Sequence, residues 1–361
     1  MSTELAPGIA RPTIAIGRFE AIRRRPARLF VLGLGVLAVS IALGIAFGSV
    51  SIPLDQTLAI LGHRFIGWPS AVTWSPSTET IVLELRLPRV LSAATVGMGL
   101  ALAGVVLQGL LRNPLADPYV LGTASGAALG AAVALLVPIQ FAFLGLGLLH
   151  LLAFAGALIA VWLVYRLSGG GSSGSITSVL LTGYAVGSLL AAGLAMAMFL
   201  SGDNLRQIFF YLLGSFAAST WAQLAVALPI VAVGSALILS RARSLNALLL
   251  GDEAAQHLGL NVRRERTLLL ALASLVTAAS VALAGLIGFV GLVVPHVVRL
   301  VVGPNARAVL PLAAVYGASF LVLADLVARI PGELPVGIVT AVVGAPFFLA
   351  LLRRYRTGYQ L

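Results

Sequence analysis

The stretch VLSAATVGMGLALAGVVLQGLL, from Val90 to Leu111, decides the fold class of this chain. Its 22 residues include no charged side chain and are mostly Leu, Val, Ala and Gly. An α-helix needs roughly 20 such residues to cross the ~30 Å hydrocarbon core of a bilayer. The stretch therefore predicts a helix that spans a membrane.

Similar apolar runs recur along the chain and predict a bundle of about ten transmembrane helices. The sequence lacks the ten-residue segments of alternating polarity that are typical of membrane β-barrels. We therefore predict an all-α, polytopic bundle. The ten predicted spans are Leu29–Val50, Val90–Leu111, Val120–Val137, Phe141–Tyr165, Ser178–Leu200, Leu224–Leu239, Thr267–Leu286, Ile287–Val302, Val309–Ala328 and Val336–Leu352.

The seventh and eighth predicted spans follow each other without a polar loop. Their junction contains Gly285, Gly288 and Gly291, and Pro295 lies just beyond it. Irregular backbone at membrane depth is tolerated where protein covers it. The junction therefore predicts a sharp reversal or a broken helix buried in protein.

The composition agrees with a membrane location. Of the 361 residues, 60% are hydrophobic and only 10% charged, and the mean hydropathy is +1.05. This leaves too little polar surface for a soluble globule. The net charge of +11 comes with 23 arginines and no lysine, placed at the ends of apolar runs, which is typical of membrane topology rather than of a nucleic-acid-binding patch. The absence of cysteine excludes disulfides, thiolate chemistry and Cys-ligated iron–sulfur clusters.

The arginines also predict the orientation. With both termini in the cytoplasm, 18 of the 23 arginines lie inside and five outside, which agrees with the positive-inside rule. Residues 1–28 are basic and lack the apolar core of a signal peptide, so they predict a cytoplasmic tail before a membrane domain over residues 29–361. The five outer arginines are Arg64, Arg86, Arg89, Arg206 and Arg329.

One polar stretch, SLNALLLGDEAAQHLGLNVRRER (Ser244–Arg266), separates the sixth and seventh spans on the cytoplasmic side. Capping residues followed by glycines predict two short helices in series. Helices this short need a surface to pack against, either the protein's own cytoplasmic face or another subunit. The predicted caps and stops are Ser244 and Gly251 around Leu245–Leu250, and Asp252 and Gly259 around Glu253–Leu258.

Within this stretch, ALLLGDEAAQHLGL (Ala247–Leu260) resembles the cytoplasmic coupling segment of the FecCD-type permeases of ABC importers. Three further blocks resemble the same family in the same order. They are LRLPRVLSAATVGMGLALAGVVLQGLLRNPLADPYVLGTASGA (Leu85–Ala127), ALAGLIGFVGLVVPHVVRLVVG (Ala282–Gly303) and LVLADLVARIPGELPVGIVTAVVGAPFFLALL (Leu321–Leu352).

The resemblance implies a homodimer of this chain in the plasma (inner) membrane of a bacterium. It also implies a cytoplasmic ABC ATPase under each copy and a substrate-binding protein on the outer face. The implied cargo is an iron–siderophore, haem or cobalamin, and the sequence does not decide between them. Because the chain lacks G-x-x-x-x-G-K-[ST], ATP hydrolysis is expected on a separate subunit. We expect no catalysis, cofactor, metal site or nucleic-acid partner.

The resemblance also suggests two docking sites. The outer arginines Arg86, Arg89 and Arg329 match positions that grip acidic residues of the binding protein, a role that suits the five-donor guanidinium group. Contact with headgroup phosphates is the alternative, and Arg329 has a second one, an ion pair with Asp325 four residues before it. The residues expected to contact the ATPase are Leu248, Gly251, Glu253, Ala255, Leu258 and Gly259.

The fifth span is the family's usual pore-facing helix, which places Thr177 and Ser178 at the expected cytoplasmic gate. Helix capping by either residue explains the pair nearly as well. In the third span, Gly122, Gly126 and Gly130 permit close helix packing, and a wide channel wall is the alternative.

Two other classes of protein are weaker interpretations. An ion-coupled secondary transporter of a small solute needs ionisable groups within the membrane, and Asp325 is the one strong candidate. A membrane-embedded enzyme needs clustered catalytic side chains, but the four histidines are scattered and form no metal-ligand motif.

Overall fold

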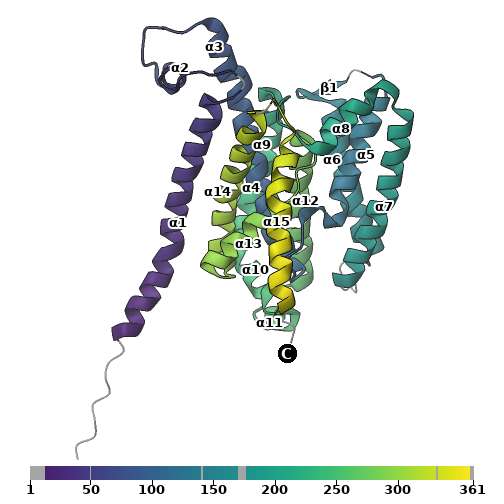
Figure 1. Ribbon diagram of the computed structural model, residues 1–361. Helices are drawn as coiled ribbons and strands as arrows, with labels where there is room; N and C mark the ends of the chain where they lie inside the picture. Colours follow the sequence, from purple (N-terminus) through teal and green to yellow (C-terminus); the bar gives the residue numbers. More distant parts are fainter. Residues whose placement is uncertain (1–12, 49, 140, 170–175, 331, 358–361) are drawn as a thin grey trace, which may run out of the picture.

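The chain folds into a bundle of upright helices (Figure 1). The structure is a computed structural model that describes all residues except 1–12, 49, 140, 170–175, 331 and 358–361. Each predicted span lies largely on one helix of this bundle. The helices are α1 (Thr13–Ala46), α4 (Leu87–Leu110), α5 (Thr123–Leu136), α6 (Leu148–Leu167), α7 (Ile176–Leu200), α9 (Trp221–Ser240), α12 (Val262–Ala284), α13 (Val290–Val302), α14 (Ala306–Arg329) and α15 (Val336–Thr357).

Among the described residues, eight helices are long and apolar enough to cross a membrane. One of them is the continuous helix Pro76–Leu110, which joins α3, η1 and α4. The apolar helices α5 and α13 have only 14 and 13 residues. The predicted helical membrane bundle is thus confirmed, whereas the count of ten crossings stays a prediction.

Short elements close the two ends of the bundle (Figure 1). One end, here called the α2 end, carries α2 (Leu54–Ile66), α3 (Pro76–Thr80), the π-helical turn η1 (Ile81–Arg86), the hairpin of β1 (Ala142–Phe143) and β2 (Leu146–Gly147), η3 (Gly202–Asn204) and α8 (Leu205–Leu213). The opposite end, the α11 end, carries α10 (Ala242–Leu249) and α11 (Asp252–His257). The 3-10 turn η2 (Pro118–Leu121) precedes α5.

Helix α4 forms the centre of the bundle and contacts α9, α12, α13 and α14. Glycines permit these contacts because they bring backbones together. A Cβ added at Gly104 would lie 1.9 Å from the carbonyl oxygen of Gly291 on α13, and one at Gly97 would lie 2.3 Å from that of Gly317 on α14. Helix α4 is therefore fixed by backbone contacts on two sides.

The glycines of the third predicted span pack in the same way. A Cβ at Gly126 would lie 2.3 Å from the carbonyl oxygen of Gly156, and one at Gly130 would lie 2.0 Å from that of Leu152. Both partners belong to α6. The packing interpretation is confirmed for these two glycines, while Gly122 precedes α5 in a left-handed conformation with φ 76°.

The predicted reversal between the seventh and eighth spans is also confirmed. Residues 285–289 leave the helical conformation, with positive φ at Gly285 and Phe289. Their polar backbone groups find partners inside the protein: the Tyr119 hydroxyl donates to the carbonyl of Ile287 (3.0 Å) and accepts from its N–H (3.1 Å). The N–H of Leu286 donates to the carbonyl of Tyr211 (3.3 Å). These bonds meet the requirement for irregular backbone at membrane depth.

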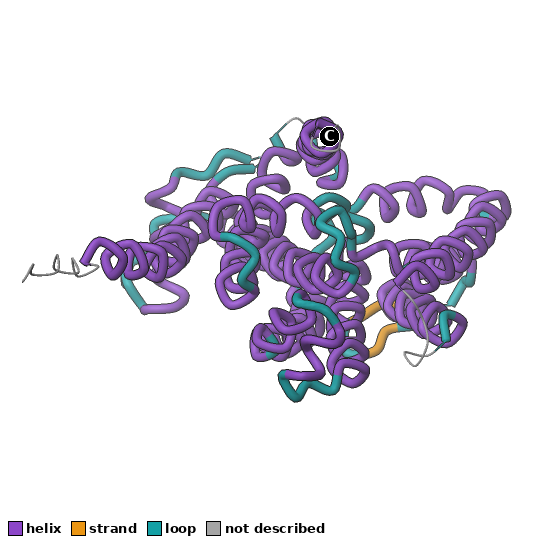
Figure 2. The backbone as a smooth tube through the Cα atoms, turned by 90° about the horizontal axis from the view of Figure 1, so that it is seen from below, coloured by secondary structure: helices purple, strands orange, loops and turns teal. Residues whose placement is uncertain are grey.

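The outer helices leave wide apolar faces uncovered. In the most apolar 18-residue stretch of α7, only 11% of the residues are buried, compared with 83% in that of the helix that contains α4. In the end-on view, α15 stands at the edge of the bundle (Figure 2). Such faces contact lipid or a further protein chain.

Candidate functional site

The predicted pair of short helices at the α11 end is confirmed by α10 and α11 (Figure 1). Gly251 and Gly259 adopt φ values of 115° and 80°, which explains why glycine stands at both stops. After α11, the N–H of Leu260 donates to the carbonyl of Ala255 (3.0 Å), and Leu260 packs on the core as its position predicts.

The predicted caps are wrong. Helix α10 begins at Ala242, so Ser244 lies inside it, and Gly251 takes the N-cap position of α11. The carboxylate of Asp252 instead accepts hydrogen bonds from Arg112 (2.6 Å) and Arg266 (2.9 Å). Hydrogen bonds to two guanidinium groups are stronger than one to a backbone N–H, which explains the exchange.

These bonds attach α10 and α11 to several helices of the bundle. Arg112 directly follows α4, and Arg266 belongs to α12. On α10, the Asn246 amide donates to the Asn305 side chain (2.9 Å) and accepts from the N–H of Ala306 (2.7 Å) at the start of α14. The segment is thus a projection that is held by the end of α4, by α12 and by the start of α14.

The six residues expected to contact an ATPase divide into two groups. Leu248 and Ala255 are buried inside this chain, so they hold the projection and are not offered to a partner. Gly251 is half-buried, whereas Glu253, Leu258 and Gly259 are exposed.

Sequence reasoning missed the exposed Leu250 and chose the buried Leu248. Leu245 and Leu248 are both buried, and their i, i+3 spacing identifies the inner face of α10. This spacing is the sequence signal that would have assigned Leu248 to the core.

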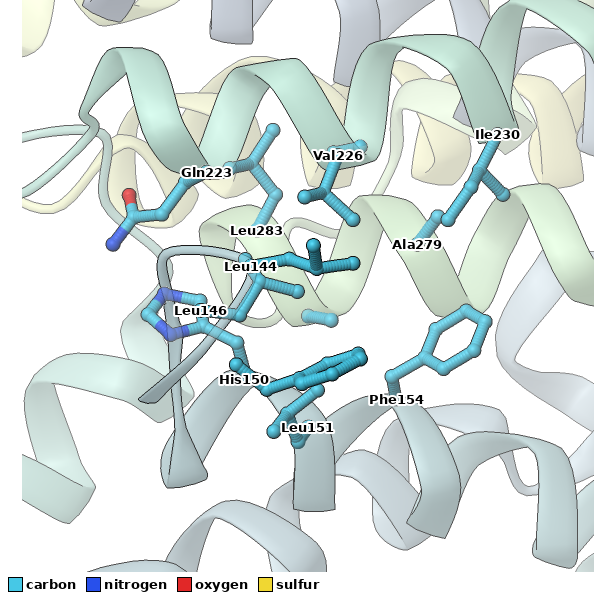
Figure 3. A pocket seen from close by; sticks show the side chains of 13 residues that line it. Leu144, Leu146, His150, Leu151, Phe154, Gln223, Val226, Ile230, Ala279 and Leu283 are labelled. Carbon is cyan, nitrogen blue, oxygen red and sulfur yellow. The ribbon is translucent and has the colours of Figure 1, made fainter. Parts of the chain in front are cut away.

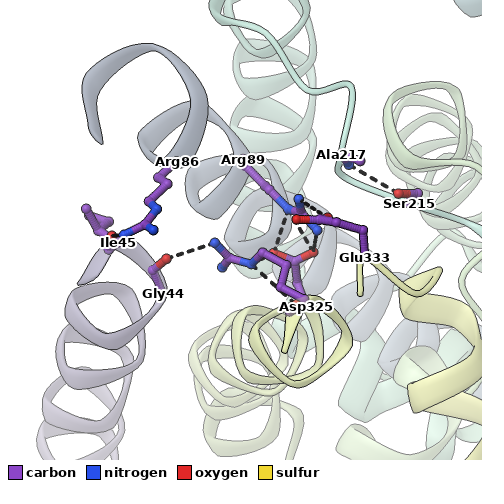
Figure 4. A network of polar contacts seen from close by, with 9 residues as sticks. Gly44, Ile45, Arg86, Arg89, Ser215, Ala217, Asp325 and Glu333 are labelled. Atoms are coloured by element: carbon purple, nitrogen blue, oxygen red, sulfur yellow. Dashed lines mark hydrogen bonds and ion pairs between the residues drawn. The ribbon is translucent and has the colours of Figure 1, made fainter. Parts of the chain in front are cut away.

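At the α2 end, the three predicted docking arginines are almost fully buried (Figure 4). The exposed fractions are 5% for Arg86, 8% for Arg89 and 3% for Arg329. Arg86 donates to the carbonyls of Ile45 (2.8 Å) and Ala46 (2.7 Å), and Arg329 donates to that of Gly44 (3.0 Å).

The carbonyls that these arginines bind belong to the last turn of α1, where no helical N–H remains to bind them. Arg86 also donates to the carbonyl of Val50, just beyond the helix. Two arginines therefore cap α1 from neighbouring helices, and their positive charge suits the negative end of its dipole.

Arg89 binds two carboxylates. Its Nε and Nη2 donate to Asp325 (3.0–3.1 Å), and its Nη1 donates to Glu333 (2.6 Å) (Figure 4). Asp325 also pairs with Arg329 (3.1 Å), which confirms the predicted i, i+4 ion pair. All three guanidinium groups thus already bind groups of this chain.

The predicted gate residues lie in the first turn of α7, which begins at Ile176. Thr177 is exposed, and the half-buried Ser178 donates to the carbonyl of Ser168 after α6 (3.5 Å). Neither residue stands at the N-cap position. The structure holds one chain, so the gate stays a prediction.

An apolar pocket at the α2 end lies between the β1–β2 hairpin, α6, α9 and α12 (Figure 3). Its volume is about 150 Å³, and Leu144, Phe154, Ile230 and Leu283 are among its lining residues. Sites for drug-sized ligands measure about 300–1,000 Å³. This pocket is too small for a bulky solute to pass.

The geometry defines a helical membrane protein. At one end, α10 and α11 project from the bundle and are held to it by polar side chains, and at the other end lies a cluster of buried arginines. The chain belongs to the FecCD transport family, whose model matches residues 36–354. It is a permease subunit of an ABC importer of this type. The family implies partnership with an ATPase and a substrate-binding protein, and the permease subunit is not itself catalytic.

Similar proteins cover most of the chain. The uncharacterized ABC transporter permease protein YvrB of Bacillus subtilis (strain 168) is 42% identical over 95% of this chain and 99% of its own length. The cobalamin import system permease BtuC of Halobacterium salinarum is 49% identical over 77% and 74%, and the hemin transport system permease HmuU of Yersinia pestis is 42% identical over 78% and 87%.

One solved structure, described as the inward-facing conformation of a metal-chelate type ABC transporter, superimposes with a TM-score of 0.78. It is 32% identical and covers 91% of this chain and 99% of its own.

Proposed function

We propose that this permease imports a metal chelate, with cobalamin as the first candidate. The observation that carries this choice is the 49% identity to a cobalamin import permease over 278 residues. Haem is the second candidate because the hemin permease is 42% identical over 292 residues. Both cargoes are bulky macrocycles with a bound metal, and such a solute suits a wide path between two chains.

We further propose a homodimer in a bacterial plasma membrane, with ten crossings and both termini in the cytoplasm. The basic residues 1–28 and the α11 end then face the cytoplasm, and the α2 end faces outward. The distribution of the arginines and the uncovered faces of α7 and α15 support this arrangement. Gly251, Glu253, Leu258 and Gly259 contact the ATPase in this proposal.

Transport in proteoliposomes tests the cargo. The permease is reconstituted with its ABC ATPase and its substrate-binding protein, and radiolabelled cobalamin, haem and ferric citrate are offered in turn. We expect ATP-dependent uptake of cobalamin. Preferred uptake of haem replaces the first candidate with the second, and uptake of neither contradicts both.

The same vesicles test the ion-coupled alternative. Asp325, its one strong candidate, is held by Arg89 and Arg329, which disfavours a group that must release and bind an ion during transport. Uptake driven by a proton or sodium gradient without ATP would support that alternative and contradict the importer.

Replacing Leu258 with serine is expected to uncouple the complex. Leu258 is 67% exposed and is one of the four residues proposed to contact the ATPase. Burying a leucine side chain in an interface is worth about 1.5–3 kcal/mol, which serine cannot supply. We expect cobalamin uptake to fall about tenfold, with the amount of folded permease unchanged.

The matched control is Leu167→Ser, because Leu167 is also 67% exposed and is the last residue of α6, outside α10 and α11. Equal losses from both variants would show a general surface effect and reject the assignment of Leu258.

A cysteine at position 177 tests the gate. Because the chain has no native cysteine, Thr177→Cys gives each permease a single thiol, and a disulfide must join two copies. We expect crosslinking that changes with ATP, since ATP binding draws the two ATPases together and moves the projections that they contact. A crosslink yield that does not change with ATP, or no crosslink in a transport-competent complex, would place the gate elsewhere.

A further inference from the structure

The arginine cluster at the α2 end carries an excess of positive charge. It consists of Arg86, Arg89, Arg329, Asp325 and Glu333, so three guanidinium groups face two carboxylates and the sum is +1 (Figure 4). In addition, the Nη2 atom of Arg329 is buried without a hydrogen-bond partner. The cluster therefore has capacity for a further anionic group.

Its two carboxylates are held very differently. Asp325 is buried in α14 and bound by two guanidinium groups. The side chain of Glu333 is 41% exposed, stands in the loop before α15 and forms one ion pair, with Arg89. Its φ of 60° is a left-handed conformation that is unfavourable for a non-glycine residue.

Glu333 is therefore the removable carboxylate. Its carboxylate is open to solvent, which weakens the ion pair with Arg89, and its left-handed backbone conformation is itself unfavourable. When Glu333 leaves, Arg89 keeps its bonds to Asp325, and the charge of the cluster rises to +2. The guanidinium edge bearing Nη1 is then free to bind another acid.

We propose that Glu333 occupies the place of an acidic side chain of the substrate-binding protein, which displaces it from Arg89 on docking. This inference rests on the proposed importer and its outward α2 end. It explains how a buried arginine acts in docking: one carboxylate replaces another, so the guanidinium group is never left without a partner. The exchange also releases the loop three residues before α15 begins at Val336.

Binding of the permease's own substrate-binding protein tests the exchange. Its affinity is measured for the permease–ATPase complex in nanodiscs, with wild type and Glu333→Gln compared at low and at physiological salt. Without its competitor, Arg89 should bind the partner up to about fivefold more tightly, with a stronger dependence on salt.

The matched control is Glu84→Gln, because Glu84 is exposed one turn before Arg89 and has no ion pair among the described residues. It removes the same charge from the same end and should leave the affinity near that of wild type. Unchanged or weaker binding by Glu333→Gln, or an equal gain from both variants, would overturn the exchange. Failure of the wild-type complex to bind at all would instead contradict the proposed importer.

A spin label at position 334 provides a second readout. Leu334 is 40% exposed, and Leu334→Cys gives the only thiol in the subunit. We expect the label to become more mobile when the binding protein docks, and to be mobile already when Glu333→Gln is added. A spectrum that does not change on docking would show that Glu333 stays on Arg89 and would reject the proposal.

Discussion

Asp325→Asn is expected to destabilise the permease by about 3–5 kcal/mol, because it leaves two buried guanidinium groups without their shared carboxylate. Asp325 accepts three hydrogen bonds from Arg89 and pairs with Arg329 through its second oxygen. The loss should appear as a lower yield of monodisperse permease in detergent and a lower midpoint of thermal unfolding.

Two variants identify the cause of this loss. Glu333→Gln removes an equal charge from the exposed side of the cluster and should cost no more than about 1 kcal/mol. Adding Arg329→Gln to Asp325→Asn removes one of the two buried guanidinium charges that lost their carboxylate, and it should recover part of the stability. Wild-type unfolding of Asp325→Asn would contradict a structural role for this carboxylate.

The second large effect is expected from the smallest change at the bundle centre, Gly104→Ala. The new methyl group would lie 1.9 Å from the carbonyl oxygen of Gly291 and 2.6 Å from its carbon. Both are backbone atoms, so no side-chain rotation relieves the clash and α4 must separate from α13. We expect a loss of at least about 3 kcal/mol, measured by the same thermal unfolding.

Gly35→Ala on α1 is the control, since a Cβ at Gly35 meets nothing within 4 Å. There the substitution should be neutral or raise stability by about 0.4–1 kcal/mol, because alanine restricts the unfolded chain. If both alanines behave alike, the close packing of α4 on α13 does not determine stability.

The membrane helices could be predicted because length and hydropathy determine them. The predicted span Val90–Leu111 lies within three residues of α4 at each end. The third span was predicted to begin at Val120, but α5 begins at Thr123, since Pro118 starts a 3-10 turn and Gly122 turns the chain.

Short elements outside the membrane have no such pattern. Helices α2 and α3 lie between the first two predicted spans, where the sequence has no long apolar run, and neither was predicted.

The polar sites were predictable only where their partners are near in sequence. The pair of Asp325 with Arg329 follows from helical spacing, whereas Arg89 and Asp325 are 236 residues apart and meet only because α4 packs on α14. The same limit applies to Asp252, whose partner Arg112 is 140 residues away. A local cap was the best prediction that the neighbouring sequence allowed.

The capping of α1 by distant arginines has a consequence for how the chain is made. Helix α1 leaves the ribosome before either arginine, because Arg86 follows its acceptor Ile45 by 41 residues and Arg329 follows Gly44 by 285. During synthesis, the last carbonyls of α1 therefore lack these hydrogen-bond donors until the later segments have been translated. Helix α1 is therefore fully attached only after α14 has been made and has packed beside it.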